Sequence, residues 1–169
     1  LSNGAMMDIG IYTLYPMVVL FGRPRRITAS GILLGSGVDG QGTVDFEYDG
    51  MGATVIYSKI ANSSLPTEIQ GEAGNLTLDR INRIGLVFWQ PRPTAASGRE
   101  TPEAPQELTR PADHDEYYYE VAEFLDLIES GRIESSINSH ARSLLCLEII
   151  DEVRRQLGIV YPADNACEP

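Results

Sequence analysis

The sequence predicts an α+β fold, in which an open, mostly antiparallel sheet of about six or more strands has helices packed on one face. Three observations predict it. A helical stretch opens the chain, alternating segments joined by short glycine turns follow, and two amphipathic stretches close it. Consecutive strands without helical crossovers pair antiparallel, because parallel pairing needs long connections.

The first helix is predicted over residues 8–21, and Gly22 and Pro24 end it. Pro16 falls inside this stretch. A proline lacks the N–H group that would bond the preceding turn, so we expect the helix to kink or to begin again there.

The strand region runs from Arg25 to about Gln90, and its clearest alternation lies in residues 43–48, directly before the hairpin signal Asp49-Gly50. The other predicted strands are residues 27–32, 53–58, 67–71, 76–78 and 86–89. The apolar positions Val44, Phe46, Tyr48, Val55 and Tyr57 are more than two helices are expected to cover. We therefore expect the open sheet face to be apolar as well, and available for oligomerisation.

The two closing helices carry apolar residues at helical spacing. The first is predicted to begin at residues 113–116 and to end at Gly131. The second is predicted to be capped by Asn138 or Ser139 and to end at Gly158.

The length of 169 residues suits a single domain, residues 1–169, with a proline-rich loop over residues 91–115. A net charge of −11 argues against binding to nucleic acid or to anionic membranes. No apolar run approaches the roughly 20 residues of a membrane span. Cys146 and Cys167 suggest no disulfide framework, which indicates a reducing, cytoplasmic compartment. The chain begins directly in patterned apolar sequence, so we expect it to be a piece of a longer protein.

Three sequence patterns could have a chemical role, and we interpret each of them first as structural. Residues 35–40 have the GxGxxG spacing of a dinucleotide-binding loop, but residues 43–46 read as a strand where that loop requires a helix, so we predict a hairpin loop. His114 and His140 have no partner at metal-ligand spacing, and we predict no metal site. In the run of tyrosines at 117–119 we expect the first to pack inward, with a ligand or interface role as the alternative.

The most informative residues for chemistry are Asp8, Gly10 and Tyr12. In a helix that begins at Asp8, the carboxylate and the phenol are four residues apart and share one face. Together they would bind a polyol and move a proton. Gly10 would let a ligand or a second backbone approach closely. The spacing alone also fits an N-capping aspartate with a buried tyrosine.

The segment Gly4–Tyr12, GAMMDIGIY, resembles the D-x-G-x-[HY] motif that opens the C-terminal domain of the Gfo/Idh/MocA oxidoreductases. It is most similar to the dihydrodiol dehydrogenase and D-xylose dehydrogenase branch, in which tyrosine replaces the commoner histidine. Further segments extend the resemblance along nearly the whole chain: residues 15–16, 20–24, 68–74, 119–124 and 150–162.

The resemblance implies an NAD(P)-dependent dehydrogenase that acts on CH–OH groups of sugars, polyols or diols. It implies a substrate-orienting role for Asp8 and an acid/base role for Tyr12 beside the nicotinamide, with oligomerisation through the sheet. The preceding Rossmann domain, which would bind NAD or NADP, is absent from this chain. A tyrosine serves as a base best when a cation lowers its pKa from about 10.

The family supplies that cation with the lysine of an E-K-P motif, which this chain lacks. Its only lysine, Lys59, falls in a predicted strand. We therefore expect the chain alone to bind no cofactor and to be inactive. Two other interpretations stay open: a stand-alone, non-catalytic dimerisation or ligand-binding module, and a two-domain regulator that binds a sugar or nucleotide without catalysis.

Overall fold

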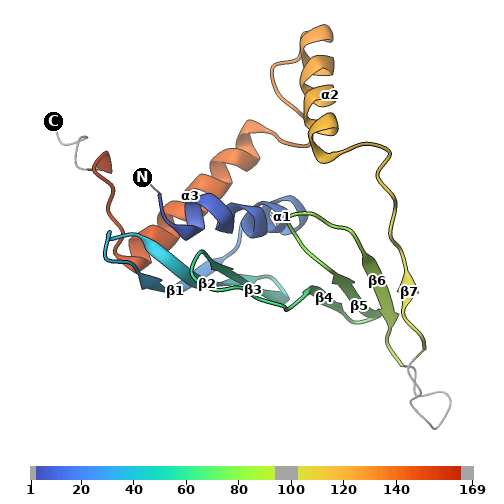
Figure 1. Ribbon diagram of the computed structural model, residues 1–169, viewed down its shortest axis with the longest axis horizontal. Coiled ribbons are helices and arrows are strands. Elements are labelled where there is room, and N and C mark those ends of the chain that lie inside the picture. The colour runs from blue at the N-terminus through green and yellow to red at the C-terminus, as the bar shows by residue number, and fades with distance from the viewer. Residues whose placement is uncertain (1–2, 94–102, 165–169) are drawn as a thin grey trace. The chain divides into compact units, whose positions relative to one another are not determined.

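The computed structural model describes residues 3–93 and 103–164. The chain divides into two compact units, one formed by Leu1–Asn62 with Leu127–Pro169 and the other by Ser63–Asp126. All strand pairs in both units are antiparallel, and the helices lie apart from the strands along the chain (Figure 1). The predicted α+β class is confirmed, with the strands arranged in two sheets.

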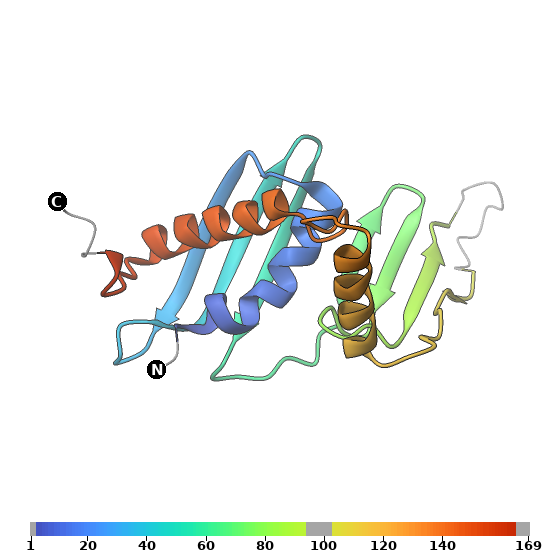
Figure 2. The same ribbon diagram turned by 90° about the horizontal axis from the view of Figure 1, so that it is seen from above.

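The first unit is a three-stranded sheet with helices on one face (Figures 1 and 2). Its strands, in the order β1-β2-β3, are Arg26–Leu33, Asp39–Tyr48 and Met51–Ser58. Its helical segments are the π-helical turn η1, Met6–Gly10, followed by α1, Ile11–Phe21, and α3, His140–Leu157. Residues 34–38 join β1 to β2, so the GxGxxG spacing forms the predicted hairpin loop.

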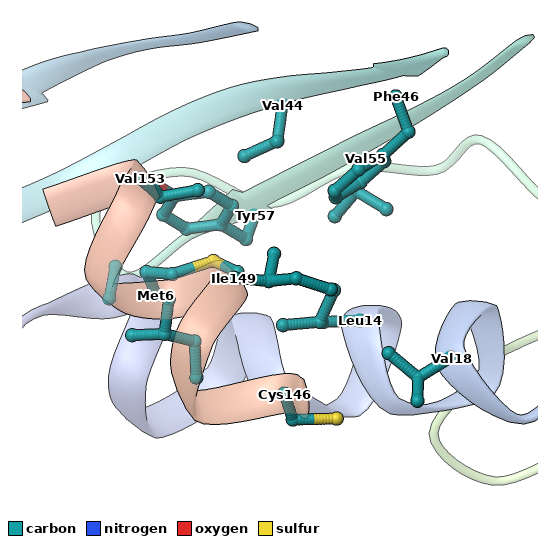
Figure 3. Close-up of a cluster of buried hydrophobic side chains, with 12 residues drawn as sticks. Met6, Leu14, Val18, Val44, Phe46, Val55, Tyr57, Cys146, Ile149 and Val153 are labelled. Atoms are coloured by element: carbon teal, nitrogen blue, oxygen red, sulfur yellow. The ribbon is translucent and has the colours of Figure 1, made fainter. Parts of the chain in front are cut away.

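The core of this unit lies between the sheet and the helices (Figure 3). Its buried side chains include Leu14, Val18, Val44, Phe46, Val55, Tyr57, Ile149 and Val153. The prediction that these strand residues also make the open sheet face apolar is therefore wrong. The N-terminal helix, formed by η1 and α1, packs on β3 while α3 packs on β1, so a single face accommodates these residues.

The opposite face of this sheet, called here the outer face, is largely polar. Because side chains alternate along a strand, it carries the residues between the core positions: Arg26, Thr28, Ser30, Ile32, Thr43, Asp45, Glu47, Thr54 and Ile56. The Thr54 hydroxyl donates to Asp45 Oδ1 at 2.6 Å, and Arg26 pairs with Glu47 at 2.7 Å. Ile32 and Ile56 remain more than half exposed.

The first helix continues through Pro16, which lies inside α1. Of the two expected outcomes, a kink or a new start, the new start does not occur, because the helix is continuous from Ile11 to Phe21. The winding changes earlier, where the π-helical turn meets α1 at Gly10 and Ile11. Leu14 and Val18, on either side of the proline, are both buried in the core. Their burial holds the helix together although one backbone hydrogen bond is lost.

The ends of α3 match the prediction, and its last turn is tied to the sheet. Ser139 caps the helix by accepting from the Arg142 N–H, and Gly158 ends it in the left-handed conformation. Gln156 reaches the edge strand β1, where its Oε1 accepts from the Ala29 N–H at 2.7 Å and its Nε2 donates to the Ile27 carbonyl at 2.9 Å. The side chain thereby satisfies backbone groups that an edge strand leaves unpaired.

The second unit contains a four-stranded sheet in the order β4-β5-β6-β7. Its strands are Thr67–Gly71, Gly74–Leu78, Val87–Pro91 and Gln106–Glu107. The predicted strand, turn and strand at 67–78 are confirmed. β7 falls inside the predicted proline-rich loop, and a two-residue strand leaves no periodic signal in a sequence. Residues 94–102 of that loop lie outside the described residues.

Helix α2, Glu116–Glu129, joins the two units along the chain. Asp115 Oδ1 accepts from the Tyr118 N–H at 2.9 Å, which caps its start as predicted. No residue of α2 is buried, and Tyr117 is 70% exposed, so the expected inward packing of this tyrosine is wrong. Among the described residues, no helix has the length and apolar character needed to cross a bilayer.

Gln156→Ala tests the link between α3 and β1. We expect the free energy of unfolding to fall by about 1–2 kcal/mol, because the edge groups of Ala29 and Ile27 lose their partners. Alanine is the better helix former, so helix propensity does not explain a loss. Urea denaturation measures the change. Gln70→Ala is the control, since Gln70 is exposed and its side-chain amide donates to Glu68 within the same strand; an equal cost for both variants contradicts the prediction.

Candidate functional site

Asp8 and Tyr12 lie in consecutive helical turns, Asp8 in η1 and Tyr12 in the first turn of α1. Residues four apart in a helix lie on the same side, so their side chains project in similar directions. The Asp8 side chain is 60% exposed and Tyr12 is 56% exposed. The alternative of an N-capping aspartate with a buried tyrosine is therefore wrong. A carboxylate and a phenol stand on one open surface of the helix.

Gly10, between them, is buried and faces the sheet. A Cβ atom at this position would lie 2.6 Å from Met6 Sδ and 3.3 Å from Tyr57 Cγ. The close approach expected at Gly10 is thus made by residues of this chain. η1 and α1 together, Met6–Phe21, are called here the site helix. A residue larger than glycine at position 10 would push the site helix away from β3, because the space is already filled.

Lys59 lies beside the carboxylate. It follows the last residue of β3 rather than lying within a strand, and its Nζ forms an ion pair with Asp8 Oδ2. The Lys59 side chain is only 24% exposed. Lys59 was not expected beside Asp8, because the two residues are far apart along the chain. The only signal was that Lys59 is the single lysine of a strongly acidic chain.

Asp39, the first residue of β2, anchors the start of the site helix. Its side chain is 1% exposed, and its Oδ2 accepts from the Met6 N–H at 2.7 Å. A negative charge at the N-terminus of a helix interacts favourably with the helix dipole. Gly4 packs directly on the other oxygen, since a Cβ atom there would lie 2.0 Å from Asp39 Oδ1. The site helix therefore begins on a buried carboxylate.

Tyr57, the ring on which Gly10 packs, is buried beside this carboxylate. Its hydroxyl lies over Gly42, where a Cβ atom would be 2.2 Å from the oxygen. Burial raises the pKa of the Tyr57 phenol far above its usual value, and the negative charge of Asp39 raises it further. Tyr57 therefore stays neutral and acts as a packing surface under the site.

The C-terminal segment contacts the same end of the helix. The Arg154 guanidinium lies 3.8 Å from the centroid of the Tyr161 ring, a cation–π arrangement. The Tyr161 hydroxyl donates to the carbonyl of Asn3, just before the site helix. The end of the described chain thereby helps to hold the start of η1.

His114 belongs to the second unit and His140 begins α3 in the first. The His114 ring stacks on Tyr118 with 3.7 Å between centroids, and His140 Nδ1 lies 3.5 Å from Glu134 Oε2. In the described ranges, no three metal-ligating side chains form a group that could hold an ion.

The comparison with known families decides the class of this chain. Residues 1–77, which include Asp8, Tyr12 and Lys59, match the model of the GFO/IDH/MocA C-terminal domain. Over these residues the chain carries the GFO/IDH/MocA C-terminal domain. This confirms the resemblance drawn from the motif at the start of the sequence.

Curated relatives of this chain extend the match beyond the first 77 residues. The scyllo-inositol 2-dehydrogenase (NADP(+)) IolU of Bacillus subtilis is 45% identical over 98% of this chain and 48% of its own length. A trans-1,2-dihydrobenzene-1,2-diol dehydrogenase of Danio rerio is 33% identical over 98% of this chain and 49% of its own length. The chain thus spans about half the length of the curated relatives it matches.

Solved structures of more distant proteins share the fold. UDP-N-acetylglucosamine 3-dehydrogenase GnnA from Acidithiobacillus ferrooxidans superposes with a TM-score of 0.70 and 18% identity, over 92% of this chain and 50% of that one. Aldose-aldose oxidoreductase from Caulobacter crescentus gives 0.69 and 19%, over 92% and 46%. At this level of identity the likeness shows the fold alone.

Asp39→Ala tests the anchor of the site helix. We expect the free energy of unfolding to fall by about 2–3 kcal/mol, because the Met6 N–H loses a charged, buried partner. Asp39→Asn keeps an acceptor of the same shape and is expected to cost about half as much. Guanidinium denaturation of both variants measures the difference. A cost below about 0.5 kcal/mol for Asp39→Ala contradicts the anchoring role.

Proposed function

We propose that this chain is the substrate-binding and oligomerisation domain of an NAD(P)-dependent dehydrogenase that acts on CH–OH groups of sugars, polyols or diols. The observation that carries the proposal is the exposed pair of Asp8 and Tyr12 on one side of the site helix. The GFO/IDH/MocA C-terminal domain at residues 1–77 and the inositol and dihydrodiol dehydrogenases among the relatives support it.

The two side chains have complementary roles in this proposal. The Asp8 carboxylate accepts a hydrogen bond from a substrate hydroxyl and orients the sugar or diol. The Tyr12 phenol exchanges the proton of the hydroxyl that is oxidised, as a general acid/base. Gly10 supports both by letting the helix lie close on Tyr57; its expected contact with substrate stays a prediction.

The GxGxxG segment at residues 35–40 does not have the surroundings of a dinucleotide-binding loop. The GxGxxG spacing leads into β2, whereas the pyrophosphate requires a helix N-terminus. We therefore propose that NAD or NADP is held by another part of the whole protein, where its nicotinamide serves as the hydride acceptor. The chain by itself is then inactive.

The exposure of Asp8 and Tyr12 also supports a role for another part of the protein in completing the site. Interactions that guide proton transfer are strong only where water is excluded. Asp8 and Tyr12 are both more than half exposed in this chain, so a further surface has to cover them. In our proposal that surface belongs to the nucleotide-binding part. We assign the activity to the cytoplasm, where Cys146 stays a buried, free thiol.

Tyr12→Phe in the whole natural protein tests the acid/base role. We expect turnover to fall by roughly 10²-fold or more with the fold intact, because phenylalanine cannot exchange the proton. Steady-state kinetics with NAD(P) and a panel of inositols, aldoses and dihydrodiols measures it. Tyr15→Phe is the matched control, since the Tyr15 hydroxyl donates to Asn138 Oδ1 at 2.8 Å and stays outside the site.

Wild-type turnover in Tyr12→Phe contradicts the acid/base role. A natural protein that oxidises none of the panel but binds a member of it favours the alternative of a non-catalytic ligand-binding or dimerisation module. The Tyr15→Phe control separates these outcomes from a general effect on the helix.

We also propose that the outer face forms an interface with a second copy of the chain. The face is broad and rich in threonine, and Ile32 and Ile56 are exposed on it. Such a surface suits face-to-face packing of two sheets. The protein is then a homo-oligomer.

Ile56→Glu is expected to shift the protein from oligomer to monomer, because it buries a charge in the proposed interface. Sedimentation velocity over a range of concentrations measures the change. Ile84→Glu is the matched control, since Ile84 has the same 53% exposure but lies in the second unit. A wild-type protein that remains monomeric at high concentration refutes the interface.

A further inference from the structure

The ion pair between Lys59 and Asp8 gives the candidate site a second charged group, which the family motif does not contain. We propose that Lys59 is a positioning residue, which holds the Asp8 carboxylate in the orientation that binds substrate. This inference rests on the proposed function and deepens it. The proposal gives a role to the Lys59–Asp8 ion pair, which belongs neither to the core of the sheet nor to the contacts of Tyr12.

The burial of the two partners indicates which of them is fixed. The Lys59 side chain is 24% exposed, whereas the Asp8 side chain is 60% exposed. A side chain with less of its surface exposed has fewer rotamers left than a more exposed one. Lys59, the less exposed partner, therefore restricts the Asp8 carboxylate.

The backbone of Lys59 is itself held in place. Its N–H donates to the carbonyl of Gly40 at 2.8 Å, which extends the pairing of β2 with β3 beyond the last residue of β3. The residue before Gly40 is Asp39, whose carboxylate anchors the Met6 N–H at the start of η1. The same two residues of β2 thus fix both the lysine and the helix that carries Asp8.

The position of Asp8 matters more than the strength of the ion pair. An exposed salt bridge contributes little to stability, because water screens it. A carboxylate that orients a reacting hydroxyl must lie within a fraction of an ångström of its working position. Lys59 is therefore expected to affect catalysis and to leave the thermal stability nearly unchanged.

Lys59→Met in the whole natural protein is expected to lower kcat/KM by about 10- to 100-fold. Lys59→Arg, which keeps a cation of similar reach, is expected to restore part of this loss. Arg23→Met is the matched control, because it breaks the ion pair of Arg23, just after α1, with Glu148 of α3, whose side chains are 66% and 44% exposed. We expect it to leave kcat/KM unchanged.

The decisive measurement is a double-mutant cycle with Asp8→Asn. If Lys59 acts through Asp8, adding Lys59→Met to the Asp8→Asn variant changes kcat/KM by less than about twofold. A loss in that background as large as in the wild type overturns the proposal, because Lys59 then acts independently. A wild-type kcat/KM in Lys59→Met overturns it as well.

Crystal structures of the natural protein and of its Lys59→Met variant separate this inference from the proposed function. We expect one carboxylate orientation for Asp8 in the presence of Lys59 and more than one in its absence. A single, unchanged orientation in both overturns the positioning role. If the protein oxidises no polyol while the carboxylate depends on Lys59, the proposed function fails and the positioning role stands.

Discussion

The buried carboxylate of Asp39 is the interaction on which the site depends. A carboxylate with 1% exposure is costly to bury unless N–H groups compensate it, and here the Met6 N–H does so at the start of the site helix. Gly4 leaves room for the Asp39 carboxylate. The carbonyl of Gly40, the next residue of β2, accepts a hydrogen bond from the backbone N–H of Lys59. One end of one strand thus holds both the helix and the lysine beside Asp8.

The core explains why that helix stays in place along its length. Leu14 and Val18 pack between the sheet and α3, and their burial outweighs the hydrogen bond that Pro16 removes. Gly10 allows the π-helical turn to lie directly on the Tyr57 ring. π-helical turns are rare and often occur at functional sites. In this chain the turn carries Asp8 and directly precedes the turn that carries Tyr12.

The exposure of Asp8 and Tyr12 has a consequence for the chemistry of the site. Asp8 and Tyr12 are both more than half exposed in the described part of the chain. Proton transfer between them and a substrate requires a drier environment than this surface provides. The chain supplies oriented groups and a rigid support, and the relatives that it matches are about twice as long.

Local physics made much of this protein readable from its sequence. The alternation of residues 43–48, the Asp49-Gly50 hairpin, the Ser139 cap and the Gly158 stop each depend on neighbours within a few residues, and each was predicted. The Asp8 and Tyr12 spacing was readable for the same reason. The motif at residues 4–12 also indicated the family resemblance, because its residues are contiguous in the sequence.

Only the tertiary structure decided what depends on contacts between distant segments. Periodicity shows that a strand has two faces but not which face helices cover, so the apolar residues were assigned to an open face that is in fact polar. It shows that α2 is amphipathic but not what packs on it. The pairing of Lys59 with Asp8 and of Asp39 with Met6 joins residues far apart in sequence. Their proximity results from the folding of β2 and β3 under the site helix, which no local pattern encodes.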